Sequence, residues 1–123
     1  MDVLTKNIAC HLFIRGFYGE DVEIDKAYED AEKLKNALTE VCSSLLSCNE
    51  DSEESYQTRF YDSFKKNFGE AKEQLRYGFS LCYMFICGFP QGPRFGFFVK
   101  CHGKHEFVNS ILVKFENLKK GIL

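Results

Sequence analysis

The clearest pattern of apolar positions runs from residue 25 to residue 47. Apolar side chains recur there every three or four residues, at Ala27, Tyr28, Ala31, Leu34, Leu38, Val41, Cys42 and Leu45. This spacing places them on one face of a helix, and no glycine or proline interrupts it. Asp25 is a suitable N-cap, and the polar run from 47 to 52 is rich in turn formers. The pattern predicts a helix over 25–47.

A second apolar stripe begins after that polar run, at about residue 53, and has the same period. It passes through Tyr56, Phe60, Phe64, Phe68, Ala71, Leu75, Phe79, Cys82 or Tyr83, and Ile86. Gly69 and Gly78 each weaken a helix by about 1 kcal/mol relative to alanine, and we expect neither to end it. The stripe therefore predicts one helix over 53–87. The short link at 48–52 predicts that it folds back antiparallel to the first helix.

The pattern is ambiguous at three places along the rest of the chain. From 79 to 89 both faces are apolar, which suits a buried helix or a buried strand. A turn follows at 90–93, and apolar residues then alternate, which predicts a short strand near 94–101. The alternative is a hairpin of 79–89 and 94–101, packed on the helices in an α+β fold. Residues 3–18 suit a helix or a strand, whereas 104–120 is predicted to be a helix.

Length and composition fit one helical domain. The chain has 123 residues, and 45% of them are hydrophobic, which is enough for a core in a domain of this size. We predict a mainly α fold that occupies residues 1–123 as a single domain. No apolar stretch is long enough to cross a membrane. We therefore expect an intracellular, cytoplasmic protein with mostly reduced cysteines and no membrane partner.

Charge is distributed unevenly between the two halves. Residues 1–60 have a net charge of −7, whereas residues 61–123 have a net charge of +5. A basic half that also contains many aromatic rings is one pattern found in nucleic-acid-binding proteins. If this chain binds RNA or DNA, the candidate contacts are Arg76, Arg94, Lys100 and Lys104.

Motifs for catalysis, phosphate loops and metals are incomplete in this sequence. Cys82, Cys87, Cys101 and His105 are weak metal candidates, because zinc sites usually contain a C-x₂-C pair and this region has C-x₄-C. No cysteine or serine lies in a recognisable nucleophile elbow. The acidic residues at 20–32 and 50–54 suit solvated surfaces better than acid–base catalysis. We therefore predict no catalytic residues and no cofactor, although a small enzyme or ligand-binding bundle with an unrecognised site remains an alternative.

One segment resembles a known family. Residues 94–100 (RFGFFVK) resemble the aromatic strand motif of RNA-recognition-motif domains, and residues 12–16 (LFIRG) resemble that family's shorter motif. The resemblance implies exposed strand aromatics that stack on bases. The two motifs differ from the family in order and spacing, because some 80 residues separate them. We do not carry the family's function over.

The surplus of aromatic residues suggests a contact surface. Eight of them lie within 77–98: Tyr77, Phe79, Tyr83, Phe85, Phe89, Phe95, Phe97 and Phe98. Aromatic rings are typical of interface cores, and a segment that is apolar on both faces needs a cover on both. The pattern predicts a non-enzymatic protein-interaction module, an adaptor or inhibitor that self-associates or binds another protein through these rings. The alternative partner is nucleic acid.

Overall fold

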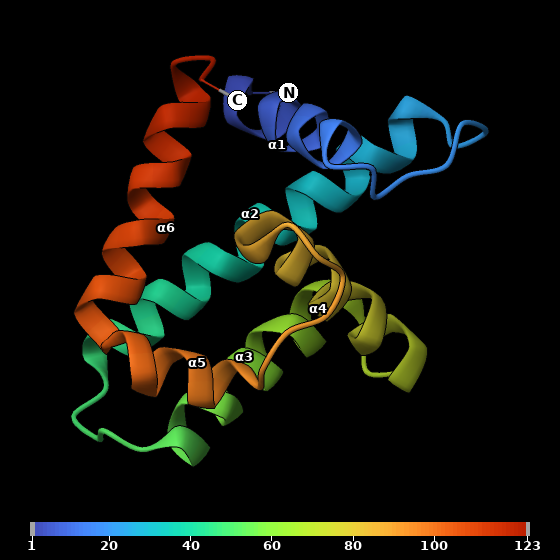
Figure 1. Ribbon diagram of the computed structural model, residues 1–123. Coiled ribbons are helices and arrows are strands. Elements are labelled where there is room, and N and C mark those ends of the chain that lie inside the picture. Colours follow the sequence, from blue (N-terminus) through green and yellow to red (C-terminus); the bar gives the residue numbers. More distant parts are fainter. Residues whose placement is uncertain (1, 123) are drawn as a thin grey trace.

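Six helices and their connecting loops make up residues 2–122 in the computed structural model of the protein (Figure 1). They are α1 (Val3–Ile14), α2 (Ile24–Ser47), α3 (Glu53–Phe68), α4 (Lys72–Cys87), α5 (Phe95–His102) and α6 (Lys104–Lys119). The described part of the chain contains no strand, so the predicted mainly α class is confirmed. The helices predicted at 25–47 and 104–120 correspond to α2 and α6.

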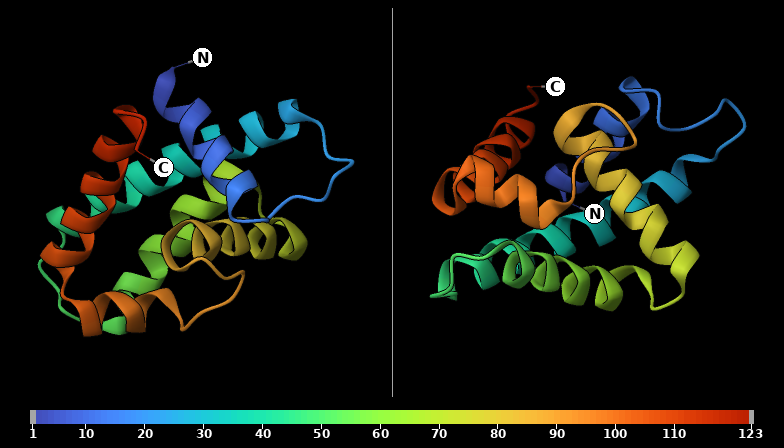
Figure 2. Two further views of the ribbon diagram at one scale, coloured as in Figure 1. Left: turned by 45° about the horizontal axis from the view of Figure 1, so that its top comes forward. Right: turned by 60° about the horizontal axis from the view of Figure 1, so that its bottom comes forward.

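Helix α2 runs through the middle of the molecule and contacts α1, α3, α4 and α6 (Figure 2). Its apolar stripe is buried as predicted, apart from the half-buried Tyr28. The helix begins one residue before the expected N-cap Asp25, and Glu23 occupies the N-cap position. Small residues on the buried face let these neighbours approach the helix closely. This explains why three alanines of α2 are fully buried.

The prediction of one helix over 53–87 is wrong, because the first helix ends at Phe68 and a second begins at Lys72. Ser52 caps the start of α3 by accepting a hydrogen bond from the Ser55 amide at 3.1 Å. The helix ends at Gly69, whose φ of +123° is strained for any residue with a side chain. The break redirects α4, which packs against α1, α2 and α3. A single helix would have carried the second half of the stripe away from these partners.

Gly78 remains inside α4, as predicted, and its missing side chain allows close packing. A Cβ at this position would lie 2.8 Å from the Phe68 ring and 3.2 Å from the Phe64 ring. Two aromatic rings of α3 therefore rest directly on the backbone of α4. The glycine lowers helix propensity, and the close approach of the two helices compensates.

The predicted strand near 94–101 is also wrong, and so is the alternative hairpin of 79–89 and 94–101. The first arm is part of α4, and the second forms α5. Apolar residues alternate in this segment, but burial does not: Phe95, Gly96 and Val99 are buried, whereas Phe97 and Cys101 are exposed. That spacing is helical. The segments that resemble RNA-recognition motifs lie on α1, the loop after it, α5 and the residue before α5, so neither forms the strand of that family.

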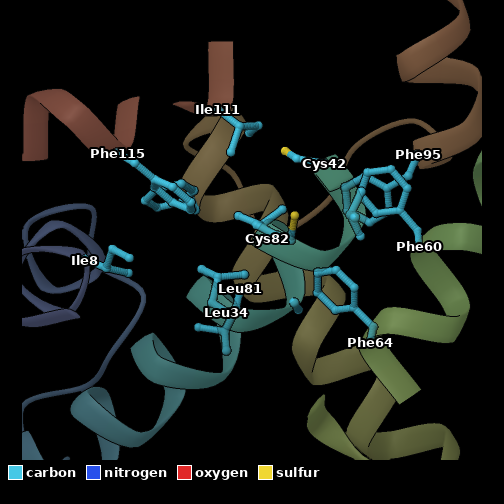
Figure 3. Close-up of a cluster of buried hydrophobic side chains, with 14 of the residues drawn as sticks. Ile8, Leu34, Cys42, Phe60, Phe64, Leu81, Cys82, Phe95, Ile111 and Phe115 are labelled. Carbon is cyan, nitrogen blue, oxygen red and sulfur yellow. The ribbon is translucent and has the colours of Figure 1, made fainter. Parts of the chain in front are cut away.

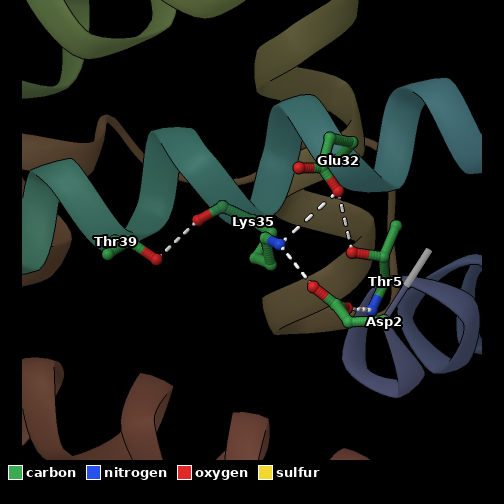
Figure 4. A network of polar contacts seen from close by, with 5 residues as sticks. All are labelled: Asp2, Thr5, Glu32, Lys35 and Thr39. Carbon is green, nitrogen blue, oxygen red and sulfur yellow. Dashed lines mark hydrogen bonds and ion pairs between the residues drawn. The ribbon is translucent and has the colours of Figure 1, made fainter.

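The ambiguity at 3–18 resolves as helix α1, which polar contacts attach to α2 (Figure 4). Asp2 caps α1 through the Thr5 amide at 2.7 Å. The other Asp2 oxygen lies 2.9 Å from the Lys35 ammonium, and the Thr5 hydroxyl donates to Glu32 at 2.9 Å. These contacts fix the first turn of α1 beside the middle of α2.

One hydrophobic core receives side chains from all six helices (Figure 3). Its largest fully buried members are aromatic, and Phe60 of α3 stacks on Phe95 of α5 with ring centroids 4.4 Å apart. Stacked rings add about 1 kcal/mol to the free energy of burial. The ring pair and the buried Val99 both contribute to holding the short helix α5 in place.

Candidate nucleic-acid interface

A groove of about 430 Å³ lies between α3, α4 and the loop that follows α4. Its lining consists of Tyr61, Lys72, Leu75, Arg76, Phe79, Ser80, Tyr83, Pro90, Gln91 and Gly92. Helix α3 supplies one wall, α4 supplies the floor, and the loop supplies the other wall. The volume is within the range of small-ligand sites.

Aromatic rings form the apolar part of the groove. Tyr61 is 40% exposed and packs edge-on against Phe79, with ring centroids 5.4 Å apart. Phe79 rests in turn on Phe64 at 5.1 Å. Tyr83 stacks on Phe95 at 4.3 Å with the two planes 9° apart. Because the core supports both Phe79 and Tyr83 from beneath, the ring surfaces in the groove are rigidly placed.

The loop wall depends on contacts with Tyr83. Its hydroxyl donates a hydrogen bond to the Pro93 carbonyl, and Gly92 lies so close to the ring that a Cβ there would be 2.7 Å from it. Burial is the main cause that raises the pKa of Tyr83 to about 12. The hydroxyl therefore stays protonated at neutral pH and keeps donating. The residues from 90 to 93 are held against α4 by this ring.

Cations border the groove without carboxylates. Lys72 and Arg76 line it, and no aspartate or glutamate does. Lys65 lies over the Tyr61 ring at 5.7 Å from its centroid. Arg94 lies with Lys65 and Tyr61 on an adjoining hollow, which Glu54 and Asp62 also line, so Tyr61 borders both spaces. Within residues 2–122, none of these four cations forms an ion pair. In the groove itself, the positive charge of Lys72 and Arg76 is available to an anionic ligand.

A larger hollow is less suited to an anion. It measures about 600 Å³ and lies between α2, α3 and the loop that joins them. Four carboxylates line it, on Glu40, Glu50, Glu54 and Asp62, together with several hydroxyls and only two cations. This balance repels phosphate groups, so the smaller aromatic groove is the better candidate for nucleic acid.

The four basic residues expected to contact nucleic acid fall into two groups. Arg76 and Arg94 border the aromatic groove or the hollow beside it. Lys100 instead pairs with the Asp51 carboxylate at 2.6 Å, and Lys104 donates to the Cys48 carbonyl at 2.6 Å. These two lysines attach α5 and α6 to the loop before α3. Their charges are already engaged within the chain.

The eight aromatic residues expected at an interface differ in how far they are buried. Phe85 and Phe95 belong to the core of the single chain. Tyr77, Phe79, Tyr83 and Phe98 are half-buried and pack against that core. Phe89 and Phe97 are mostly exposed, at 69% and 49%. Two of the eight rings therefore face solvent in one copy of the chain, and Phe79 and Tyr83 line the groove.

The weak metal candidates do not converge. Cys82 is buried, Cys87 is half-buried, and Cys101 and His105 are exposed. Among residues 2–122, no group of three or more potential ligands is placed to hold a metal ion. All six cysteines are free thiols in the structure. None of the helices in the described part of the chain is long and apolar enough to span a membrane.

Sequence reasoning did not find Tyr61, Lys65 and Lys72. Tyr61 lies off the apolar stripe of α3, one residue after Phe60, so its exposure was readable from the helical period. Lys65 follows Tyr61 by four residues, and this spacing is the signal for its position over the ring. Nothing in the sequence around Lys72 indicated its position, because its place in the groove depends on the end of α3 at Gly69.

Comparisons with known proteins found partial similarity to an enzyme. The chain is 33% identical over 92 residues to the lysine–tRNA ligase of Rickettsia prowazekii (strain Madrid E), a match that covers 73% of this chain and 17% of the ligase. It is 34% identical over 89 residues to the lysine–tRNA ligase of Rickettsia typhi (strain ATCC VR-144 / Wilmington), which covers 71% and 16%. The chain thus matches about one sixth of the length of these relatives. No protein-family model and no solved structure matches it.

Proposed function

We propose that this chain is an RNA-binding helical module, related to a segment of lysine–tRNA ligase, that seats an unpaired base in the groove between α3 and α4. The observation that carries the proposal is the groove itself, with its exposed Tyr61 ring, its supported Phe79 and Tyr83 rings, and its unpaired cations. The two relatives are enzymes whose name includes tRNA. The proposal is a binding function and assigns no reaction to this chain.

The groove has an aromatic part suited to the base of a nucleotide and a basic part suited to its phosphate. The rings favour the flat face of a base, which contributes about 1–3 kcal/mol per stacked base in single-strand binders. Lys72 and Arg76 lie toward the start of α4, where the helix dipole also favours negative charge. A phosphate at that end and a base against the rings would fill a groove of this size. Phe89 is exposed on the same loop, one residue before the part of the loop that lines the groove.

The test is the binding of a short single-stranded RNA, followed by fluorescence anisotropy at several salt concentrations. We expect Tyr61→Ala to weaken binding about tenfold or more, because one stacking surface is lost, whereas Tyr61→Phe keeps the ring and most of the affinity. Arg76→Gln should lower the salt dependence by about one counterion. Tyr61 is partly exposed, so its truncation leaves the core intact.

The matched control is Lys66→Gln, which removes one charge from α3 outside the groove. Lys66 borders the acidic hollow and pairs with Glu40 at 3.3 Å. We expect it to bind RNA within twofold of the unchanged protein. Equal losses in Lys66→Gln and Arg76→Gln, or unchanged affinity in Tyr61→Ala, would show that RNA does not use the groove.

We propose self-association as a second function, because Phe89 and Phe97 are exposed in the single chain. Burying two such rings contributes roughly 1.5–3 kcal/mol each. Light scattering should then report a mass above the 14.3 kDa of one chain at micromolar concentration, and Phe89→Ser should lower it. A mass of one chain at all concentrations would reject this function and leave the RNA proposal standing.

A further inference from the structure

A second, smaller pocket lies where the end of α1 meets α6 and the end of α4. It measures about 180 Å³, which is the space of roughly six water molecules, and is lined by His11, Arg15, Lys114, Asn117, Leu118 and Ile122. Three of these six side chains can carry positive charge, and none is acidic. The aromatic groove shares no residue with it.

Arg15 and Lys114 of this pocket both lie against the end of α4. The Arg15 guanidinium rests on Gly88, where a Cβ would lie 2.3 Å from one of its nitrogens. The Lys114 ammonium donates to the Phe85 carbonyl and lies 4.7 Å from the centroid of the Phe85 ring. Neither cation forms an ion pair with an acidic residue within 2–122. Two like charges thus share a partly enclosed space, and no acidic side chain within 2–122 pairs with either.

His11 is a wall of the same pocket and supplies a second observation. It is 5% exposed, and its Nε2 has no hydrogen-bond partner among the described residues. Burial, followed by the charges of Lys114 and Arg15, lowers the pKa of His11 to about 4. Burial and Arg15 also lower the pKa of Lys114. Burial is the largest cause of both shifts, and the repulsion between the cations adds to it. A bound anion would relieve that repulsion.

We propose that the pocket formed by Arg15, Lys114 and Asn117 binds the phosphate group of a ligand. A tetrahedral oxyanion fits the volume, and guanidinium, ammonium and amide groups are its usual partners. The phosphate belongs either to a small phosphorylated molecule or to RNA. The site is independent of the aromatic groove, because its cations lie at the C-cap of α1 and on α6.

A structural role for the same cations makes the competing prediction. Lys114 donates to a carbonyl in the last turn of α4, and such contacts stabilise helix C-termini without any ligand. If capping is their only role, phosphate will act on the pocket like any other salt. The experiment therefore compares inorganic phosphate with chloride at equal ionic strength.

The probe is inorganic phosphate, and the readout is the NMR signal of the His11 ring together with the backbone amides of residues 11–15 and 114–118. We expect a saturable shift with phosphate, no comparable shift with chloride, and a rise in the pKa of His11 as its charged form gains a counter-ion. Arg15→Gln should weaken phosphate binding about tenfold, and Arg15→Lys should retain most of it. Lys119→Gln removes an equal charge from α6, paired with Glu116 at 3.2 Å, and should bind within twofold of the unchanged protein.

Identical responses to phosphate and chloride in the unchanged protein would overturn the proposal, and this comparison needs no variant. Equal weakening by Arg15→Gln and Lys119→Gln would also overturn it. A short RNA, with and without a 5′-phosphate, distinguishes the two sources of the phosphate. RNA that displaces inorganic phosphate and shifts the His11 signal indicates a nucleic-acid phosphate. RNA that does neither indicates a small phosphorylated molecule. Tyr61→Ala should leave inorganic phosphate binding unchanged, so the two proposals fail separately.

Discussion

Gly96 is the position where the structure most clearly reverses an expectation from helix propensity. It lies in the first turn of α5, and a Cβ there would be 2.2 Å from the Glu53 carbonyl oxygen and 3.0 Å from the Gln57 Cβ. Its amide also donates to the Gln57 side chain at 2.8 Å. The backbone of α5 is thus in direct contact with the start of α3, and a methyl group has no space.

The expected change in stability follows from three contributions. Alanine in place of glycine inside a helix stabilises it by about 1 kcal/mol. Against this, α5 must retreat from α3 by roughly 1 Å to reach ordinary contact, and overpacking of this kind costs about 1–3 kcal/mol. The retreat also weakens the amide hydrogen bond to Gln57, which contributes about 1 kcal/mol. We therefore expect Gly96→Ala to destabilise the fold by about 2 kcal/mol.

Thermal and urea unfolding, followed by circular dichroism, measure this effect. A loss of 2 kcal/mol corresponds to a melting temperature lower by about 10 °C in a domain of this size. Phe95 stacks on both Phe60 and Tyr83, so displacement of α5 should also change the near-ultraviolet signal of the aromatic residues. Asn109→Ala, at an exposed position of α6, is the control and should stabilise by about 0.5 kcal/mol. A Gly96→Ala protein as stable as the unchanged one would refute the packing argument.

Three further predictions concern buried polar groups and thiols. Stability should fall as pH drops from about 6.5 to about 4, because His11 takes up a proton in this range in the unfolded chain, whereas its pKa in the fold is about 4. Thermal melts should show a loss on the order of 2 kcal/mol over this range. The variant His11→Gln should lose less stability. Asp30→Ala should cost about 3 kcal/mol in urea unfolding, since two tyrosine hydroxyls and Lys26 lose their buried acceptor. Cys101 should react with a thiol reagent in the folded protein, whereas Cys42, whose pKa burial raises to about 11, should react only on unfolding.

Each of these predictions has a contrary result. The same pH dependence in His11→Gln as in the unchanged protein would assign the acid sensitivity to other groups. If Asp30→Ala is as stable in urea as the unchanged protein, the two tyrosine hydroxyls find other hydrogen-bond acceptors. Equal rates of modification at Cys101 and Cys42 would mean that α2 opens readily from the core.

The sequence by itself determined the mainly α class and the faces of its clearest helices. In α2 and α6 the spacing of apolar residues is a local property, and the turn formers at 47–52 marked the end of the first helix in the sequence. Ser52 could be predicted as a boundary residue for the same reason, because a hydroxyl that caps a helix needs only an amide three residues later. The burial of the α2 stripe followed directly from its period.

The break at Gly69 and the helical state of 95–102 were decided by tertiary structure. Gly69 and Gly78 have the same intrinsic cost, yet one ends a helix and the other is buried within one, because only Gly78 meets the rings of α3. Apolar residues alternate over 95–101 as they do in a strand, but no strand among residues 2–122 is present to form backbone hydrogen bonds with this segment. As a helix, the segment forms these bonds internally and contacts Phe60 and Gln57 of α3.

The candidate sites depend most on tertiary structure. The groove joins Tyr61 of α3 to Tyr83 and Gly92 across the break, and the phosphate pocket joins Arg15 to a lysine 99 positions later. Sequence reasoning found Arg76 and Arg94 by charge alone, and it could not separate them from Lys100 and Lys104, whose partners lie in a distant loop. Apolar periodicity reports which side of a helix is buried. It does not report which helices meet, and the sites lie where they meet.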